Sequence, residues 1–474
     1  MKRERKLMAL SGVLAACAAG AFGLSRIDFE EKMTGTETTI VDVDSADITY
    51  LAWNYEDSET AFVCEDGEWS YEADEKMAVD QELLNEIAEN LSAITSDKKV
   101  EEVQSLGVYG LSDPAYEITI QTADDAFEIA VGDETFSDGE VYISNGDGYV
   151  YLTDAGLIDD ISYTLLDCVQ KEEIPEMESI SEVLVENENS TDIIYKENSG
   201  YCYSDAYTYY LKDGEDYRNL DNESTEDTFA SLSEFSWEEC VDYYADDTEL
   251  GNYGLAEPDA TVSVAYEPAK EEDAEETEDS EENGEETQKF EYEVGAVDEA
   301  YYARLTGSNI VYRISEDLYQ AAVNVSYEEL KPDEVVLLDW DTVESIEVEL
   351  DGNVYTIGLE KDDEDAYIYT LENEEIEFGD ILDQLSEITI AEETDDEDVP
   401  ETEPALSGKR SEMSLIFHRN TESYQTVELE FYQYDGSYCI SVLNGEELNY
   451  TSRTAVVDLK EAVNAVILDS SQAE

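Results

Sequence analysis

The chain of 474 residues has a single histidine, His418, so imidazole chemistry would have to depend on that residue. A serine or cysteine nucleophile needs a base beside it, and histidine is the usual base. His418 ends the run from Met413 to His418, whose pattern predicts a strand. An ordinary sheet residue is therefore the simpler interpretation, and we predict no catalytic role for His418.

Carboxylates are the other abundant chemical groups, because the chain has 123 Asp and Glu residues against 24 Lys and Arg residues. Paired carboxylates hydrolyse glycosides in many enzymes. With so many acids, however, any given pair arises by chance. Asp42-Val43-Asp44 could form a pair of ligands, but a lead-in to the first strand is the simpler interpretation.

Other reaction classes lack the motifs that they require. The phosphate-cradling patterns Gly-x-x-x-x-Gly-Lys and Gly-x-Gly-x-x-Gly do not occur in the sequence. The sequence therefore predicts a protein that is not an enzyme, with no catalytic, cofactor-binding or metal-binding residues and no cofactor.

The formal net charge of −99 restricts the partners of the chain. Neutralising phosphates needs basic stripes, which are absent, so nucleic acid is excluded and anionic lipid is disfavoured beyond an anchor. Divalent cations should condense on this surface diffusely, without a defined site. Hydrophobic residues still make up 42% of the chain, which is enough for a core.

Cysteine usage indicates no disulfide framework. The five cysteines beyond residue 26 are odd in number and form no Cys-x-x-Cys pair: Cys64, Cys168, Cys202, Cys240 and Cys439. Four or five buried thiols are the favoured interpretation, with one bridge, such as Cys202 to Cys240, left open. Zinc is disfavoured because the chain has only one histidine.

The N-terminus has the pattern of a membrane anchor. Lys2, Arg3, Arg5 and Lys6 precede an uncharged stretch from Leu7 to Leu24, after which the chain is acidic. This pattern predicts a single segment, residues 1–26, in the cell membrane with the body outside the cytoplasm. Leu14-Ala15-Ala16-Cys17 resembles a lipoprotein signal, so a lipid on Cys17 or a cleaved secretory signal remain alternatives.

The body of the chain repeats a phrase. Gly107 to Pro114 and Gly251 to Pro258 share the pattern Tyr-Gly-Leu-x-x-Pro, and each precedes a strand-like run. Upstream of each lies a Leu-Ser motif that has a third copy at Leu385 to Thr389. The spacing predicts three related units, residues 40–172, 178–330 and 340–470.

Each unit has strands, a helix, a turn and further strands, which predicts α+β domains of antiparallel sheet. Expected strands are 47–55, 61–71, 116–121, 126–132, 140–144 and 149–153, then 180–185, 191–196, 200–211, 260–266 and 289–294, then 343–350, 353–359, 413–418, 426–434 and 438–443. Expected helices are 80–94 with Asp80 as N-cap, 154–166, 225–237, 316–323, 376–389 and 455–468.

The repeated phrase predicts a structural elbow, in which Gly110 and Gly254 permit a positive φ. In the third unit the elbow is reduced to Glu403 to Gly408. Two acidic insertions, residues 271–287 and 392–403, offer almost nothing to a core. We expect the first to be a disordered hairpin tip rather than a calcium loop.

The Tyr-Gly-Leu-x-x-Pro phrase, the hairpin after it, the Val-Tyr strands at Val150 and Val311, and the N-terminal anchor resemble the bacterial family known as domain of unknown function 4340. The resemblance covers most of the first two units and is weaker for the third. It implies a setting in envelope ABC-transporter systems of the gliding-motility auxiliary type. It brings no catalytic residues.

Two functions from different classes follow. In the first, the chain is a membrane-anchored, non-catalytic accessory subunit whose partner is an envelope or transporter protein. In the second, it is an autonomous surface module that binds cations, wall polymer or an extracellular ligand.

Overall fold

The computed structural model describes residues 33–472 apart from these gaps: 35–36, 56–57, 101, 104, 136–138, 189, 196–201, 215, 270–286, 363–365, 392–398, 401–403 and 446. The predicted anchor, residues 1–26 with Cys17, lies outside the described residues. So do the acidic insertion at 271–287, except Thr287, and most of the one at 392–403. In the part of the chain that is described, no helix is long and apolar enough to cross a membrane.

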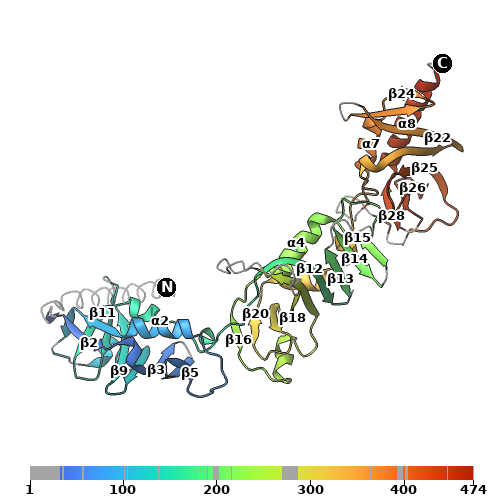
Figure 1. Cartoon of the computed structure of the whole chain (residues 1–474). Coiled ribbons are helices and arrows are strands. Elements are labelled where there is room, and N and C mark those ends of the chain that lie inside the picture. Colours follow the sequence, from blue (N-terminus) through green and yellow to red (C-terminus); the bar gives the residue numbers. More distant parts are fainter. Residues whose placement is uncertain are drawn as a thin grey trace, which may run out of the picture. The chain divides into compact units, whose positions relative to one another are not determined.

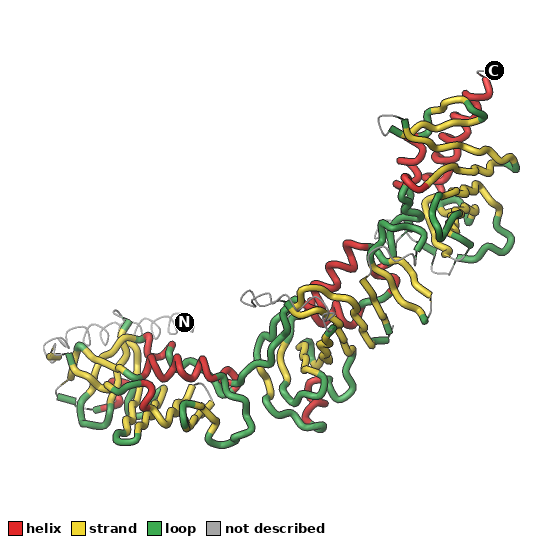
Figure 2. The backbone as a smooth tube through the Cα atoms, in the orientation of Figure 1, coloured by secondary structure: helices red, strands yellow, loops and turns green. Residues whose placement is uncertain are grey.

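The fold is α+β, as predicted, with antiparallel sheets and a few helices (Figure 1, Figure 2). The chain forms two compact units. Among the described residues, unit 1 holds those up to residue 173 together with 237–249 and 307–313, and unit 2 holds the rest.

The first sheet lies in unit 1 and joins strands from the first part of that unit to strands from its later part. From edge to edge its strands are β1 (Met33–Thr34), β7 (Lys98–Val100), β11 (Val150–Asp154), β10 (Glu140–Ser144), β9 (Ala126–Glu134), β8 (Tyr116–Thr122), β3 (Ile48–Tyr55), β4 (Ser58–Glu65) and β5 (Glu68–Tyr71). A separate pair joins β2 (Thr38–Asp42) to β6 (Ala93–Ser96). Within unit 1, β16 (Cys240–Asp242) pairs with β20 (Val311–Arg313).

Helix α2 (Gln81–Leu91) covers one face of the first sheet (Figure 1). Asp80 caps it as predicted, since its side chain accepts a hydrogen bond from the Leu83 N–H. The helix ends at Leu91, so the expectation that it continues to Ile94 was wrong. Ile94 is buried in β6 instead, because residues 93–96 pair with β2.

The strands of unit 2 form two larger groups. The first runs in the order β15 (Asp216–Asn219), β14 (Tyr209–Asp213), β13 (Thr191–Tyr195), β12 (Met177–Glu186), β17 (Ala260–Pro268), β18 (Gln288–Val297) and β19 (Ala300–Leu305). The other, hereafter the third sheet, runs β24 (Glu374–Ile376), β23 (Tyr367–Leu371), β22 (Asn353–Lys361), β21 (Val343–Leu350), β25 (Arg410–Arg419), β26 (Thr426–Gln433), β27 (Tyr438–Leu443) and β28 (Glu447–Ser452).

The helices of unit 2 pack on these sheets. They are α4 (Asn222–Ser233), α5 (Glu316–Asn324), α6 (Tyr327–Leu330), α7 (Gly379–Ser386) and α8 (Arg453–Gln472). Leu382 of α7 and Leu459 of α8 enter the same buried cluster as Phe417 and Phe431 of the third sheet. Both helices therefore cover its inner face, where apolar residues alternate with outward polar ones.

The three large sheets share one feature of strand order. In each, a meander before the main helix and a meander after it are joined by antiparallel pairing of their first strands: β3 with β8, β12 with β17, and β21 with β25. The hairpin between β21 and β22 turns at Asp351 and Gly352, whose φ angles of 49° and 83° are those that the predicted Asp-Gly turn requires.

Further expectations were wrong in extent, and one of them is the helix expected at 225–237, which is Asn222–Ser233 in the structure. The helix expected at 154–166 is reduced to α3 (Gly156–Asp159) and a 3₁₀ turn at Leu166–Cys168, since Gly156 and several β-branched residues favour helix weakly. The strand expected at 200–211 begins only at Tyr209, because the Asn222 side chain bonds the backbone of Ala206 and Thr208 and holds a loop. The helix expected at 376–389 is α7 alone, since Glu374–Ile376 pairs with β23.

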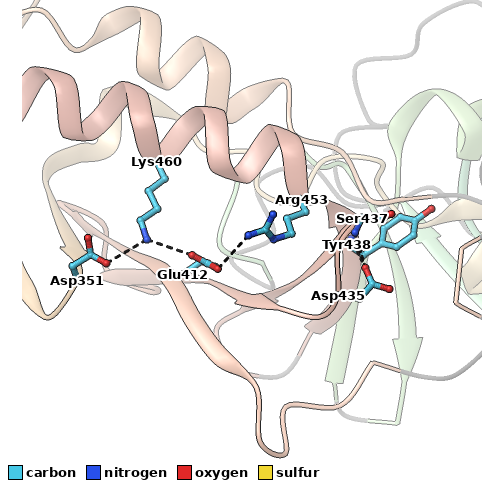
Figure 3. A network of polar contacts seen from close by, with 7 residues as sticks. All are labelled: Asp351, Glu412, Asp435, Ser437, Tyr438, Arg453 and Lys460. Carbon is cyan, nitrogen blue, oxygen red and sulfur yellow. Dashed lines mark hydrogen bonds and ion pairs between the residues drawn. The ribbon is translucent and has the colours of Figure 1, made fainter.

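A network of charges fixes α8 to the third sheet (Figure 3). Lys460 of α8 lies 3.3 Å from Glu412 and 3.4 Å from Asp351, and Arg453 lies 3.9 Å from the same Glu412. The Glu412 side chain is only 11% exposed. Its charge is therefore opposed by two of the few cations in the chain.

Candidate binding groove on the first sheet

The first sheet has an inner and an outer face, which its cross-strand pairs define. Trp69, on the same face as Cys64 opposite it, donates its indole N–H to Asn85 of α2 at 3.0 Å, so the helix covers this inner face. Leu51 and Phe62 face each other on that side and are fully buried. The alternate residues point to the outer face.

A groove of about 590 Å³ lies on the outer face, along β8, β3, β4 and the end of β5. Its floor is the pair Ala52 and Ala61, which stand directly opposite each other on β3 and β4. Thr119, the partner of Ala52 on β8, continues the floor. The hollow exists because two of these side chains end at a methyl group where a longer one would fill the space.

The rim of the groove is acidic. Glu59, Glu72 and Glu117 contribute to its lining, all three are exposed, and the lining contains no Lys, Arg or His. Tyr50 donates a hydrogen bond from its hydroxyl to Glu72 at 3.4 Å. Burial and this carboxylate raise the pKa of Tyr50, so the phenol stays a neutral donor.

Asn54 fixes one end of the groove. Its amide nitrogen donates to the carbonyl of Ala115 at 3.4 Å, and its amide oxygen accepts from the N–H of Glu117. The side chain thus ties β3 to the start of β8 and holds Glu117 at the rim.

The elbow covers the other half of the same outer face. Ala130 on β9 is the cross-strand partner of Glu117, so both lie on one face, and Ala130 packs against the cluster of Tyr109 and Leu111. Tyr109 meets Tyr142 edge-on with ring centroids 5.0 Å apart. The groove therefore lies within the part of this face that the elbow leaves open.

The elbow is confirmed as a structural turn, with φ of 73° at both Gly110 and Gly254. In each copy the next residue closes a backbone hydrogen bond of 3.0 Å: Leu111 to the carbonyl of Leu106, and Leu255 to that of Leu250. The aromatic contact recurs as well, since Tyr253 meets Tyr302 at 5.2 Å.

Two glycines on which the elbows rest were not predicted from the sequence. A Cβ on Gly132 of β9 would lie 2.1 Å from the Tyr109 carbonyl oxygen, and a Cβ on Gly295 of β18 would lie 2.5 Å from that of Gly254. Only glycine permits these approaches. The signal was present, because the dipeptide Val-Gly follows each elbow, at Val131 and at Val294.

The residues considered for chemistry have structural places. His418 lies in β25, with its Nε2 3.3 Å from a carboxylate oxygen of Glu347, and both side chains are more than a third exposed. Asp42 ends β2, and Asp44 caps a short 3₁₀ turn by accepting from the Ala46 N–H. The structure does not bring His418 together with either aspartate in a described contact.

Cys64, Cys168, Cys240 and Cys439 are free thiols, so the bridge from Cys202 to Cys240, an open alternative in the sequence analysis, is not formed. Burial raises the pKa of Cys168 and of Cys240 to about 12, and that of Cys439 to about 11. These thiols are therefore protonated and unreactive at neutral pH. Among the described residues, no three His, Cys, Asp or Glu are grouped closely enough to hold a metal ion.

One half-buried carboxyl in unit 1 was also missed. The Tyr312 hydroxyl donates to the carboxylate of Glu172 at 3.3 Å and accepts from the Glu172 N–H at 2.9 Å. Trp237 stacks on Tyr312 at 4.5 Å and donates its indole N–H to the Glu172 carbonyl. Burial raises the pKa of Glu172 and outweighs the hydrogen bonds from Ser308 and Tyr312, which lower it. These contacts join three segments distant in sequence.

A comparison with protein families agrees with the resemblance over part of the chain. Residues 69–242 match the family model described as "Domain of unknown function (DUF4340)". The match includes α2, the first elbow and Gly132, and it ends before the second elbow. No curated protein matches the chain.

Proposed function

We propose that the chain is a membrane-anchored, extracytoplasmic protein that acts by binding, as an accessory or interaction subunit of an ABC-transporter-type envelope complex. The observation that carries the proposal is the open groove on the outer face of the first sheet, beside the part that the elbow covers. Its side chains offer charge and shape for a partner. The match of residues 69–242 to the DUF4340 model supports the family resemblance, and the envelope setting is proposed from that resemblance.

We further propose that three related units, residues 40–172, 178–330 and 340–470, make up the body. The shared pairing of β3 with β8, β12 with β17 and β21 with β25 supports this, and so does the matching geometry of the first two elbows. Such an arrangement gives an anchored chain several sheet faces that can diverge independently.

Capture of the partner from the native host tests the function. We expect the affinity-tagged full-length chain, crosslinked in intact cells, to co-purify with the permease or ATPase of a transporter. Ala61→Leu, which fills the groove, should reduce this recovery, whereas Thr356→Leu, at an exposed outward position of the third sheet, should not. Recovery of wall polymer without any transporter protein would instead favour the autonomous surface module.

Topology is tested separately. Protease added to intact protoplasts should degrade the body and spare only the first two dozen residues. Full protection of the body would contradict the extracytoplasmic location.

A further inference from the structure

The uncovered half of the outer face carries a charge pattern that identifies the kind of partner it fits. Glu59, Glu72 and Glu117 line the groove from three different strands or strand ends, around the Ala52–Ala61 floor. Since no cation is among the lining residues, an anionic ligand would be repelled. A second copy of this chain is disfavoured for the same reason, because each carries a formal charge of −99.

The spacing of the carboxylates distinguishes an organic cation from a metal ion. In the described part of the chain no three acidic residues come together as metal ligands, and the three glutamates of the groove are no exception. They instead surround a hollow of about 590 Å³, within the size range of sites for organic ligands. A flexible, extended cationic side chain with an apolar stem suits a floor of methyl groups and a rim of carboxylates.

We propose that the groove binds a segment of a partner protein through a Lys or Arg side chain, whose stem lies over Ala52 and Ala61 and whose charge lies among Glu59, Glu72 and Glu117. This inference rests on the proposed binding function and specifies its partner chemistry. Tyr50, at the same end as Glu72, adds an aromatic surface on which a guanidinium can pack. Asn54 fixes the backbone at Glu117 before the partner arrives.

Diffuse attraction to so acidic a chain must be separated from groove binding. The probe is a fluorescein-labelled peptide, Gly-Arg-Ala-Arg-Gly, and its control replaces both arginines with citrulline, which has a similar shape without charge. Binding is measured by fluorescence anisotropy with the purified full-length chain at 150 mM salt. We expect the arginine peptide to bind at least tenfold more tightly than the citrulline peptide.

Variants then locate the binding. Ala61→Leu leaves the net charge unchanged and should weaken arginine-peptide binding at least tenfold, whereas Thr356→Leu should change it less than twofold. Glu59→Gln should weaken binding more than Glu347→Gln, which removes one charge from the outer face of the third sheet. Glu59 is exposed, so this variant tests the proposal even if Ala61→Leu melts early.

Two outcomes would overturn the proposal. Equal binding by Ala61→Leu and Thr356→Leu would show that only diffuse charge attracts the peptide. If the wild type bound a neutral wall tetrasaccharide but not the arginine peptide, and Ala61→Leu lost this binding, the groove would be a carbohydrate site. In either case, undiminished co-purification of a transporter protein would leave the proposed function standing. Tight binding of the arginine peptide without co-purification of a transporter protein would contradict the proposed function but not the proposed chemistry of the groove.

Discussion

The first and third sheets share the pairing of their meanders but differ on their outer faces. On the first, Ala52 faces Ala61 and leaves a groove, while on the third Glu347 faces Thr356 and His418 lies beside them. Their inner faces are alike, each filled with buried aliphatic and aromatic residues under helices. The inner face therefore maintains the fold, and the outer face is free to acquire a binding surface.

The first and third elbows also differ, in how each is attached to its sheet. Gly110 fits against the backbone of Asp133, and Tyr109 against Gly132, so backbone touches backbone. Gly408 of the third elbow also has a positive φ, 78°, but a Cβ there would meet nothing within 4 Å. The third segment is instead attached through side chains, since Leu406 and Val399 pack on the cluster of Tyr438, Ile440, Val442 and Tyr450. Covering of this face persists although the glycine contact is lost.

The largest effect should come from breaking the backbone contact. We expect Gly132→Val to destabilise unit 1 by about 3 kcal/mol, because its Cβ would overlap the Tyr109 carbonyl. Gly110→Val and Gly254→Val should cost roughly 1 to 3 kcal/mol through positive-φ strain and contact with the neighbouring strand. Denaturant unfolding followed by hydrogen exchange in β9 and β18 measures each unit separately.

Gly408→Val is the matched control. Gly408→Val has the same positive-φ strain as Gly110→Val, but its Cβ meets no neighbouring atom. We therefore expect a loss of stability of about 1 kcal/mol or less. Equal losses at Gly132 and Gly408 would remove the distinction between the two kinds of elbow.

The next effect concerns the charges that close the third sheet. We expect Glu412→Gln to destabilise it by about 1 to 2 kcal/mol, because Lys460 and Arg453 would lose their shared and largely buried carboxylate. Asp351→Asn, at the exposed end of the same network, should cost less than about 0.5 kcal/mol. Thermal melting of the two variants at equal salt compares their losses of stability. A greater loss in Asp351→Asn than in Glu412→Gln would contradict the prediction.

The sequence was sufficient for the parts of this comparison that depend on local patterns. Alternating residues placed most strands, Asp80 marked the start of α2, and Asp351-Gly352 marked a hairpin. It was not sufficient where distant segments decide. Ile94 leaves the helix pattern because β2 pairs with it, and the fit of Gly132 under Tyr109 depends on a contact across a sheet. The groove was missed because two alanines signal nothing until pairing places them face to face.

A smaller, pH-dependent effect is expected at Glu172 in unit 1. The folded-state pKa of Glu172 is raised above the ordinary glutamate value of 4.5, so the protonated carboxyl stabilises the fold. This contribution is complete below pH 4.5 and is lost as the pH rises through the folded-state pKa. Glu172→Gln mimics the protonated form. The melting temperature of the variant minus that of the wild type should thus be near zero at pH 4 and positive at pH 7. Exposed Glu173→Gln is the control, and a difference that falls as the pH rises would contradict the assignment.

The smallest effect separates the groove from the rest of the acidic surface. Repulsion among exposed carboxylates is screened by salt, so stability should rise gradually with added sodium chloride. Millimolar calcium should act more strongly than its ionic strength alone, because divalent ions bind clustered carboxylates. Since the groove glutamates are not grouped as metal ligands, isothermal titration should give many weak sites, identical in the wild type and in Glu59→Gln. If one or two calcium ions bound tightly to the wild type and not to Glu59→Gln, the outer face of the first sheet would be a metal site rather than a surface for an organic cation.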